Sequence, residues 1–123
     1  MSILLLASDL MTASKFAASA LRVSRDADFA MSVELLLERA AATPPTAVIL
    51  DLSVAGLDLP PLIAQLRGGP QPPTIIAFGP HVHAALLDAA REAGCEEVLT
   101  RGDFHRRMDE VLAKIAPPQG EKK

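Results

Sequence analysis

The residues from Ala47 to Asp51 place the tightest constraint on what this chain can fold into. Four apolar residues lead directly into one carboxylate, with two prolines just before them and a Gly/Asp/Pro-rich segment, 53–61, after them. A short apolar run between turn signals predicts a strand that is buried on both faces, as strands of parallel sheets are. Functional side chains of such sheets lie just past the carboxyl ends of the strands, where Asp51 stands. The alternative is that Asp51 only begins the loop.

Three other short apolar segments predict further strands, at residues Ile3–Leu6, Thr74–Phe78 and Glu97–Leu99. The segment Arg25–Ala30 has mixed polarity and predicts a weak strand near an edge of the sheet. Between the predicted strands, apolar residues recur at the spacing of an amphipathic helix. The predicted inward faces include Ala13, Phe16, Ala17, Ala20 and Leu21 in the first helix, and Val82, Ala85, Leu86, Ala89, Ala90 and Ala93 in the fourth. We expect Asp103 to cap one last helix, with Phe104, Met108, Val111, Leu112 and Ile115 facing inward.

Strands that alternate with helices indicate βαβ units, and therefore a five-stranded parallel sheet with helices on both faces. The strand order 2-1-3-4-5 of the flavodoxin-like, doubly wound α/β fold fits best, because it puts the polar second strand at an edge. We predict one domain over residues 1–116, followed by a flexible tail, 117–123. In this order the first and third strands are neighbours, so Asp9 and Asp51 should share one crevice.

Composition excludes several classes of function. A net charge of −3 gives no general attraction for nucleic acid, and no apolar run approaches the length of a membrane span. The lone Cys95 fits a reducing compartment, so we expect a soluble cytoplasmic protein. The three histidines, His81, His83 and His105, lack the spacing of a zinc site, and we expect them on helix surfaces.

A pair of carboxylates in one crevice is typical of a hard-cation site. Mg²⁺ prefers oxygen ligands and often takes only one or two protein carboxylates, so Asp9 and Asp51 are candidates for a weak Mg²⁺ site. A carboxylate beside such a cation can attack a phosphoryl donor. The alternative is two solvated aspartates at the starts of loops.

From Ser2 to Ala116 the chain resembles the response-regulator receiver domains, the CheY-like family. The similar segments are residues 3–9, 47–51, 73–78 and 89–101. Each segment alone is only weakly specific for the family, but their order and spacing together are more specific. The resemblance implies that Asp51 is the phosphoacceptor and that Asp9 belongs to the acidic pair that holds Mg²⁺.

Other positions depart from the family pattern. Ser8 stands where the second acid would be, and Phe78 stands where a Thr or Ser would contact the phosphoryl group; a one-residue shift would put Gly79 there instead. The chain has Arg101 and Gly102 in place of the family's Lys-Pro pair, and Val98 in place of the aromatic switch residue of the fifth strand.

These departures all weaken phosphate chemistry. Ser8 removes a charge from beside the cation, and the missing hydroxyl removes a hydrogen bond to a charged group, worth on the order of 1.5–3 kcal/mol. Phe78 adds bulk, and Arg101 is not interchangeable with lysine. We therefore expect a degenerate receiver, or pseudo-receiver, whose crevice is held by an Asp51–Arg101 ion pair.

The resemblance implies a signalling domain of two-component systems that is not itself an enzyme and needs no cofactor beyond a weakly bound Mg²⁺. Expected partners are a histidine kinase, a downstream effector or a second copy of the chain. Candidate contact residues on the fourth helix, fifth strand and fifth helix are Asp88, Arg91, Thr100, Arg106 and Asp109. Two alternatives stay open, a working phosphoacceptor modified on Asp51 and a small-ligand-binding or enzymatic flavodoxin-like domain.

Overall fold

The computed structural model describes residues 2–115, so the predicted tail at 117–123 lies outside the described residues. The strands are β1 (Ile3–Leu6), β2 (Ala27–Ala30), β3 (Ala47–Asp51), β4 (Thr74–Gly79) and β5 (Glu97–Thr100). The helices are α1 (Leu10–Arg22), α2 (Val33–Ala42), α3 (Leu59–Leu66), α4 (Ala84–Glu92), α5 (Arg101–Arg106) and α6 (Met108–Lys114). Within this range no helix combines the length and the apolar composition that crossing a membrane requires.

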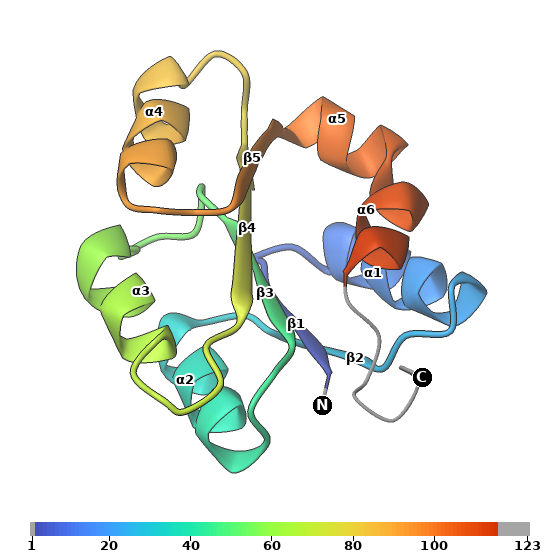
Figure 1. Ribbon diagram of the computed structural model, residues 1–123. Coiled ribbons are helices and arrows are strands. Elements are labelled where there is room, and N and C mark those ends of the chain that lie inside the picture. The colour runs from blue at the N-terminus through green and yellow to red at the C-terminus, as the bar shows by residue number, and fades with distance from the viewer. Residues whose placement is uncertain (1, 116–123) are drawn as a thin grey trace.

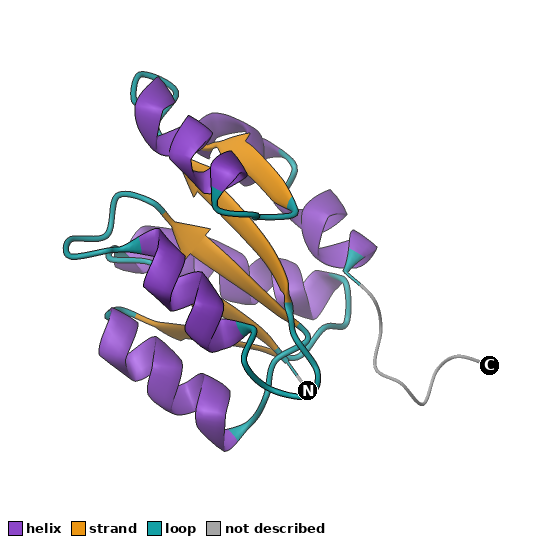
Figure 2. Ribbon diagram, turned by 60° about the vertical axis from the view of Figure 1, so that its left-hand side comes forward, coloured by secondary structure: helices purple, strands orange, loops and turns teal. Residues whose placement is uncertain are grey.

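The five strands form one parallel sheet in the order β2-β1-β3-β4-β5, which confirms the predicted fold class and topology. Helices α1, α5 and α6 cover one face, and α2, α3 and α4 cover the other (Figures 1 and 2). Strand β3 lies at the centre and is buried along its whole length, because both faces and both edges are covered. This is the burial that its continuous apolar sequence predicted.

Successive side chains of the strands point to opposite faces, so the sheet separates two apolar cores. Ile3 and Leu5 belong to the core under α1, α5 and α6, whereas Leu4 and Leu6 belong to the core under α2, α3 and α4. All four phenylalanines lie on the first of these faces; three are buried in its core, and Phe29 packs against it.

The end of the chain differs from the prediction of one helix capped by Asp103. Thr100 is the N-cap of α5, and its hydroxyl accepts the backbone N–H of Asp103. The helix is interrupted at Arg107, whose backbone leaves helical geometry, and α6 follows. The inward residues were predicted correctly, since Phe104, Met108, Val111, Leu112 and Ile115 are all buried.

The predicted inward face of α1 was partly wrong. Leu21 is 81% exposed, whereas Ser19 is fully buried and its hydroxyl donates to the carboxylate of Asp109 in α6. Arg22 also donates to Asp109, from Nε and Nη2, each at 2.9 Å. A polar link between α1 and α6 therefore takes the place expected for an apolar contact.

The predicted face of α4 was also partly wrong. Ala90 is buried as predicted, but Leu87 faces the core instead of Leu86, and Val82 and Leu86 are 70% and 39% exposed. Adjacent leucines in an alanine-rich segment fit two helical faces equally well, so spacing alone could not choose between them.

The assignment of the α4 face can be tested with two neighbouring substitutions. Leu87→Ala should lower the free energy of unfolding by roughly 2–5 kcal/mol, because it leaves a cavity in the core. Leu86→Ala should cost less than about 1 kcal/mol, because this side chain lies at the surface and its removal leaves no enclosed cavity. Urea unfolding followed by circular dichroism measures both values, and a larger loss for Leu86→Ala would contradict the observed face.

Candidate functional site

The candidate site lies where the carboxyl ends of the central strands meet. Strands β1 and β3 are neighbours, Asp51 pairs in register with Phe78 of β4, and Arg101 begins α5 directly after β5. Parallel strands end at the same edge of a sheet, so residues far apart in the sequence converge here. The topology thus brings Asp51, Phe78 and Arg101 together, as predicted.

Asp51 is fully buried, and its carboxylate is occupied by neighbouring groups. Its Oδ1 accepts the backbone N–H of Ser53 at 3.0 Å and the Ser53 hydroxyl at 2.6 Å. Arg101 Nη2 donates to Oδ1 at 3.1 Å and to Oδ2 at 3.3 Å. The ion pair expected from the sequence is therefore present, and Asp51 also begins the loop in the way the simpler interpretation proposed.

Arg101 connects three acceptors through one nitrogen. Nη2 also donates to the Ser53 hydroxyl at 2.8 Å, so the contacts to Asp51 are not the two-pronged pairing that a guanidinium often makes. The carbon centre of the guanidinium lies 5.4 Å from the centroid of the Phe78 ring, within the range of a cation–π contact. The Arg101 side chain is 33% exposed, so it closes the crevice from the solvent side.

Phe78, which the resemblance places where a receiver domain would have a hydroxyl, lies at the carboxyl end of β4 beside Asp51. Its ring is fully buried and stacks on that of Phe104, with centroids 4.3 Å apart and an interplanar angle of 11°. The alternative alignment with Gly79 offers no hydroxyl either. A Cβ at Gly79 would approach Leu52 Cβ to 3.3 Å, so a side chain at this position has little room.

Asp9 lies at the same edge, but its carboxylate serves a different purpose. It is the N-cap of α1, and Oδ2 accepts the backbone N–H of Thr12 at 3.0 Å and the Thr12 hydroxyl at 3.1 Å. The bond from the Thr12 N–H lowers the pKa of Asp9, and the charge of Arg101 contributes to the same shift. Ser8 is exposed and lines a shallow groove with residues of segments 31–34 and 54–56.

The arrangement does not fit a Mg²⁺ site. Both oxygens of Asp51 accept hydrogen bonds from Arg101, Asp9 is engaged by Thr12, and the neighbouring position carries Ser8 instead of an acid. Residues 2–115 contain no group of three histidine, cysteine or acidic side chains that could hold a metal ion. A cation would have to displace the guanidinium before it reached the carboxylate of Asp51.

His105 and Thr12 belong to the site and were missed as such. His105 Nε2 lies 3.4 Å from the Thr12 hydroxyl, and its ring meets those of Phe78 and Phe104 edge-on. The expectation of a surface histidine is therefore wrong, because the ring of His105 is half-buried between Thr12 of α1 and the two phenylalanine rings. Burial lowers the pKa of His105, as do the charges of Lys15 and Arg101. His81 and His83 are exposed and precede α4 instead of lying within it.

Val98 and Gly102, the two other positions at which the resemblance implies a departure from the family pattern, lie outside the crevice. Val98 is half-buried and packs against the core under α2, α3 and α4. Gly102 lies in the first turn of α5, where a Cβ would meet no atom within 4 Å. Neither residue contributes a polar group to the site.

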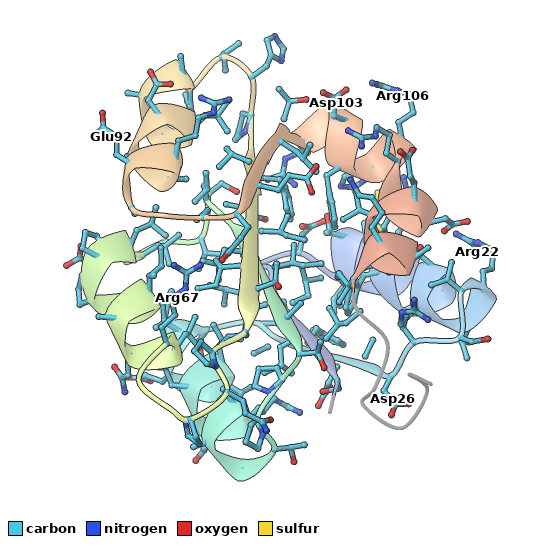
Figure 3. The ribbon with its side chains drawn as sticks, viewed as in Figure 1. Arg22, Asp26, Arg67, Glu92, Asp103 and Arg106 are labelled. Carbon is cyan, nitrogen blue, oxygen red and sulfur yellow. The ribbon has the colours of Figure 1, made fainter. Side chains whose placement is uncertain are left out.

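The candidate contact residues are distributed over four elements, α4, β5, α5 and α6. Asp88 and Arg91 pair with each other on α4, at 2.9 Å, and Arg106 pairs with Asp103 on α5, where Figure 3 shows the two side chains on the same helix. Thr100 is used as the cap of α5. Asp109 faces α1, where its bonds to Arg22 and Ser19 lower its pKa to about 2.

Removing the Arg101 side chain tests how much its ion pair with Asp51 contributes to the stability of the fold. We expect Arg101→Ala to lower the free energy of unfolding by roughly 1–3 kcal/mol, because the buried carboxyl group of Asp51 loses its ion-pair partner and two hydrogen bonds. Arg101→Lys should retain most of the stability, since a single nitrogen makes the contacts to Asp51.

The matched control is Arg91→Ala, which breaks an exposed pair and should cost about 0.5 kcal/mol or less. All three variants can be compared by chemical denaturation at neutral pH. Equal losses for Arg101→Ala and Arg91→Ala would contradict a stabilising role for the buried ion pair.

The half-buried His105 should give the stability of the protein a pH dependence. Its pKa in the folded state lies below the ordinary value of 6.5, so below that pH the unfolded chain binds the proton more readily. Stability should therefore fall as the pH is lowered through the range between 6.5 and the depressed folded value. Unfolding measured between about pH 5 and pH 8 should show a shallower slope for His105→Gln than for the unmodified protein. The exposed His81→Gln should keep the original slope, and an unchanged slope in His105→Gln would refute the assignment.

Comparison with protein-family models found no match to this sequence, and comparison with curated proteins found none either. Comparison with solved structures found many similar chains. A response-regulator receiver domain from Bermanella marisrubri superposes with a TM-score of 0.79 at 20% identity, covering 92% of this chain and 95% of that one.

Two further structures show the same similarity. The receiver domain of NtrX from Brucella abortus gives a TM-score of 0.74 at 15% identity, covering 93% of this chain and 99% of that one. The receiver domain of a sensor histidine kinase from Pseudomonas aeruginosa, which has a magnesium ion in its active-site cleft, gives 0.76 at 15% identity and covers 92% and 94%. The chain therefore has the fold of the response-regulator receiver domains.

Proposed function

We propose that this protein is a receiver-like signalling domain that acts through contacts with another protein and not through phosphorylation of Asp51. The observation that carries the proposal is the state of the Asp51 carboxylate, which is fully buried and bound by both Arg101 and Ser53. A carboxylate in this state is a structural anion, whereas a phosphoacceptor needs an oxygen that is free to attack phosphorus.

Three features support the loss of phosphate chemistry. The guanidinium of Arg101 must leave before a phosphoryl donor can approach Asp51. Ser8 supplies no charge for a cation, and the buried ring of Phe78 occupies the space where a hydroxyl would contact the phosphoryl group. The missing charge and the missing hydroxyl bond each raise the free energy of a phosphorylated state.

The surface that we assign to partner contacts consists of the outward sides of α4 and α5 with the end of β5. It carries the pair Asp88–Arg91, the residue Arg106 and the capping Thr100. The exposed side chains of Val82 and Leu86 add apolar area to its α4 side. A histidine kinase, a downstream effector or a second copy of the chain is the expected partner.

A second candidate function is that of a working phosphoacceptor. It is favoured by the position of Asp51 at the carboxyl end of β3 and by Asp9 at the same edge of the sheet. One similar receiver domain holds magnesium in its cleft. In this reaction an oxygen of Asp51 would bond to phosphorus as the bond between phosphorus and the leaving group breaks.

Phosphorylation distinguishes the two functions directly. The protein is incubated with Mg²⁺ and acetyl phosphate, and its intact mass is measured. We expect no added phosphoryl group. A stoichiometric adduct that disappears in Asp51→Asn would establish the phosphoacceptor and overturn the proposed function.

The explanation for the lost chemistry can be tested by restoring it. The triple variant Ser8→Asp, Phe78→Thr, Arg101→Lys returns the acid, the hydroxyl and the lysine that receiver domains carry. We expect it to gain an adduct under the same conditions, whereas the same triple variant with Asp51→Asn should not. A folded triple variant that stays unmodified would show that these three positions do not account for the loss.

A further inference from the structure

A cavity of about 320 Å³ lies between the carboxyl ends of α2 and α3, at the opposite end of the sheet from Asp51. The two helices lie on the same face of the sheet (Figure 1). The volume is within the range of small-molecule sites, about 300–1,000 Å³. Apolar side chains from both helix ends and from the proline-rich turns before β3 and β4 form most of its wall, including Leu37, Ala40, Ala41, Pro44, Pro45, Leu66, Pro70 and Pro73.

No charged side chain lines this cavity, and its polar side chains are two primary amides. These belong to the exposed residues Gln65 and Gln71, and neither side-chain amide has a hydrogen-bond partner among residues 2–115. The wall therefore offers an apolar surface with neutral polar groups at its edge.

Three residues that line the cavity have backbone carbonyls for which the sequence provides no helical N–H partner. In a helix, each carbonyl accepts the N–H four residues later, but four residues after Ala40, Ala41 and Leu66 the sequence has Pro44, Pro45 and Pro70. These residues have no N–H to give.

The nearby N–H groups are used elsewhere. Thr43 donates to Arg39 and Gly68 donates to Gln65, so within residues 2–115 the carbonyls of Ala40, Ala41 and Leu66 receive no backbone N–H. Each of these three residues lines the cavity.

The ends of α2 and α3 also carry the negative poles of two helix dipoles. The basic side chains nearby are directed to other partners. Arg39 in the last turn of α2 pairs with Asp28 at 2.7 Å, Arg67 just after α3 pairs with Glu96 at 2.5 Å, and the last turn of α3 has no basic residue. The apolar cavity therefore lies beside the negative ends of two helix dipoles and beside carbonyls that accept no backbone N–H. No cationic side chain of residues 2–115 lines it.

We propose that this cavity binds small organic ammonium ions. The apolar part of the ligand would lie against the leucine, alanine and proline side chains, and its ammonium hydrogens would donate to the open carbonyls at the helix ends. The site is independent of the proposed signalling function, because it shares no residue with the crevice around Asp51.

The probe is benzylammonium, compared with benzyl alcohol as a neutral molecule of similar shape. Titration followed by backbone amide shifts in two-dimensional NMR should give saturable changes near residues 37–43 and 65–71 and none near Asp51. Benzylammonium should bind about tenfold more tightly than the alcohol, because its hydrogen bonds are charge-assisted. The proposal is overturned if the shifts do not saturate, if they centre elsewhere, or if both molecules bind equally.

Two neighbouring substitutions locate the site. Ala41 and Ala42 are both exposed on α2, but only Ala41 lines the cavity. Ala41→Leu should abolish the saturable shifts by filling the space, whereas Ala42→Leu should leave the affinity unchanged. Loss of binding in both variants, or in neither, would refute the assignment.

Discussion

A buried carboxylate that must keep a counterion is the constraint on which the carboxyl edge of this structure depends. Asp51 has a side-chain exposure of 1%, and burial of an isolated charge is costly unless a partner offsets it. Arg101 provides that partner from the first turn of α5 and so links the central strand to the last part of the chain. The same guanidinium lies over Phe78, whose ring stacks on Phe104 of α5. The ion pair and the aromatic stack together fix how α5 meets the sheet.

Much of the fold could be predicted from the sequence, because a strand that is buried on both faces of a sheet has a continuous run of apolar residues. The run from Ala47 to Asp51, the other apolar runs and the helices between them allow few topologies, and the polar second strand selects the order. The helix faces were harder to predict. Leu86 and Leu87 are chemically the same residue, so only the packing of α4 on the sheet decides which one is buried.

For the candidate site, topology and charge indicated the Asp51–Arg101 pair, because two strand ends in one sheet bring these residues together. The Ser53 bonds could have been found as well, since an aspartate that begins a loop often binds the residue two positions on. His105 could not have been found, because its contact with Thr12 requires knowledge of how α5 packs on α1. For Asp9, local capping of α1 prevailed over the cation site that its position suggested.

The two faces of the sheet also differ in what they reveal to spectroscopy. The chain has no tryptophan and no tyrosine, and its four phenylalanines all lie on the face covered by α1, α5 and α6. Near-ultraviolet circular dichroism of these rings therefore reports on that core alone. The aliphatic core beneath α2, α3 and α4 has no intrinsic chromophore, so a tryptophan introduced there would provide a signal free of background emission from any other tryptophan or tyrosine.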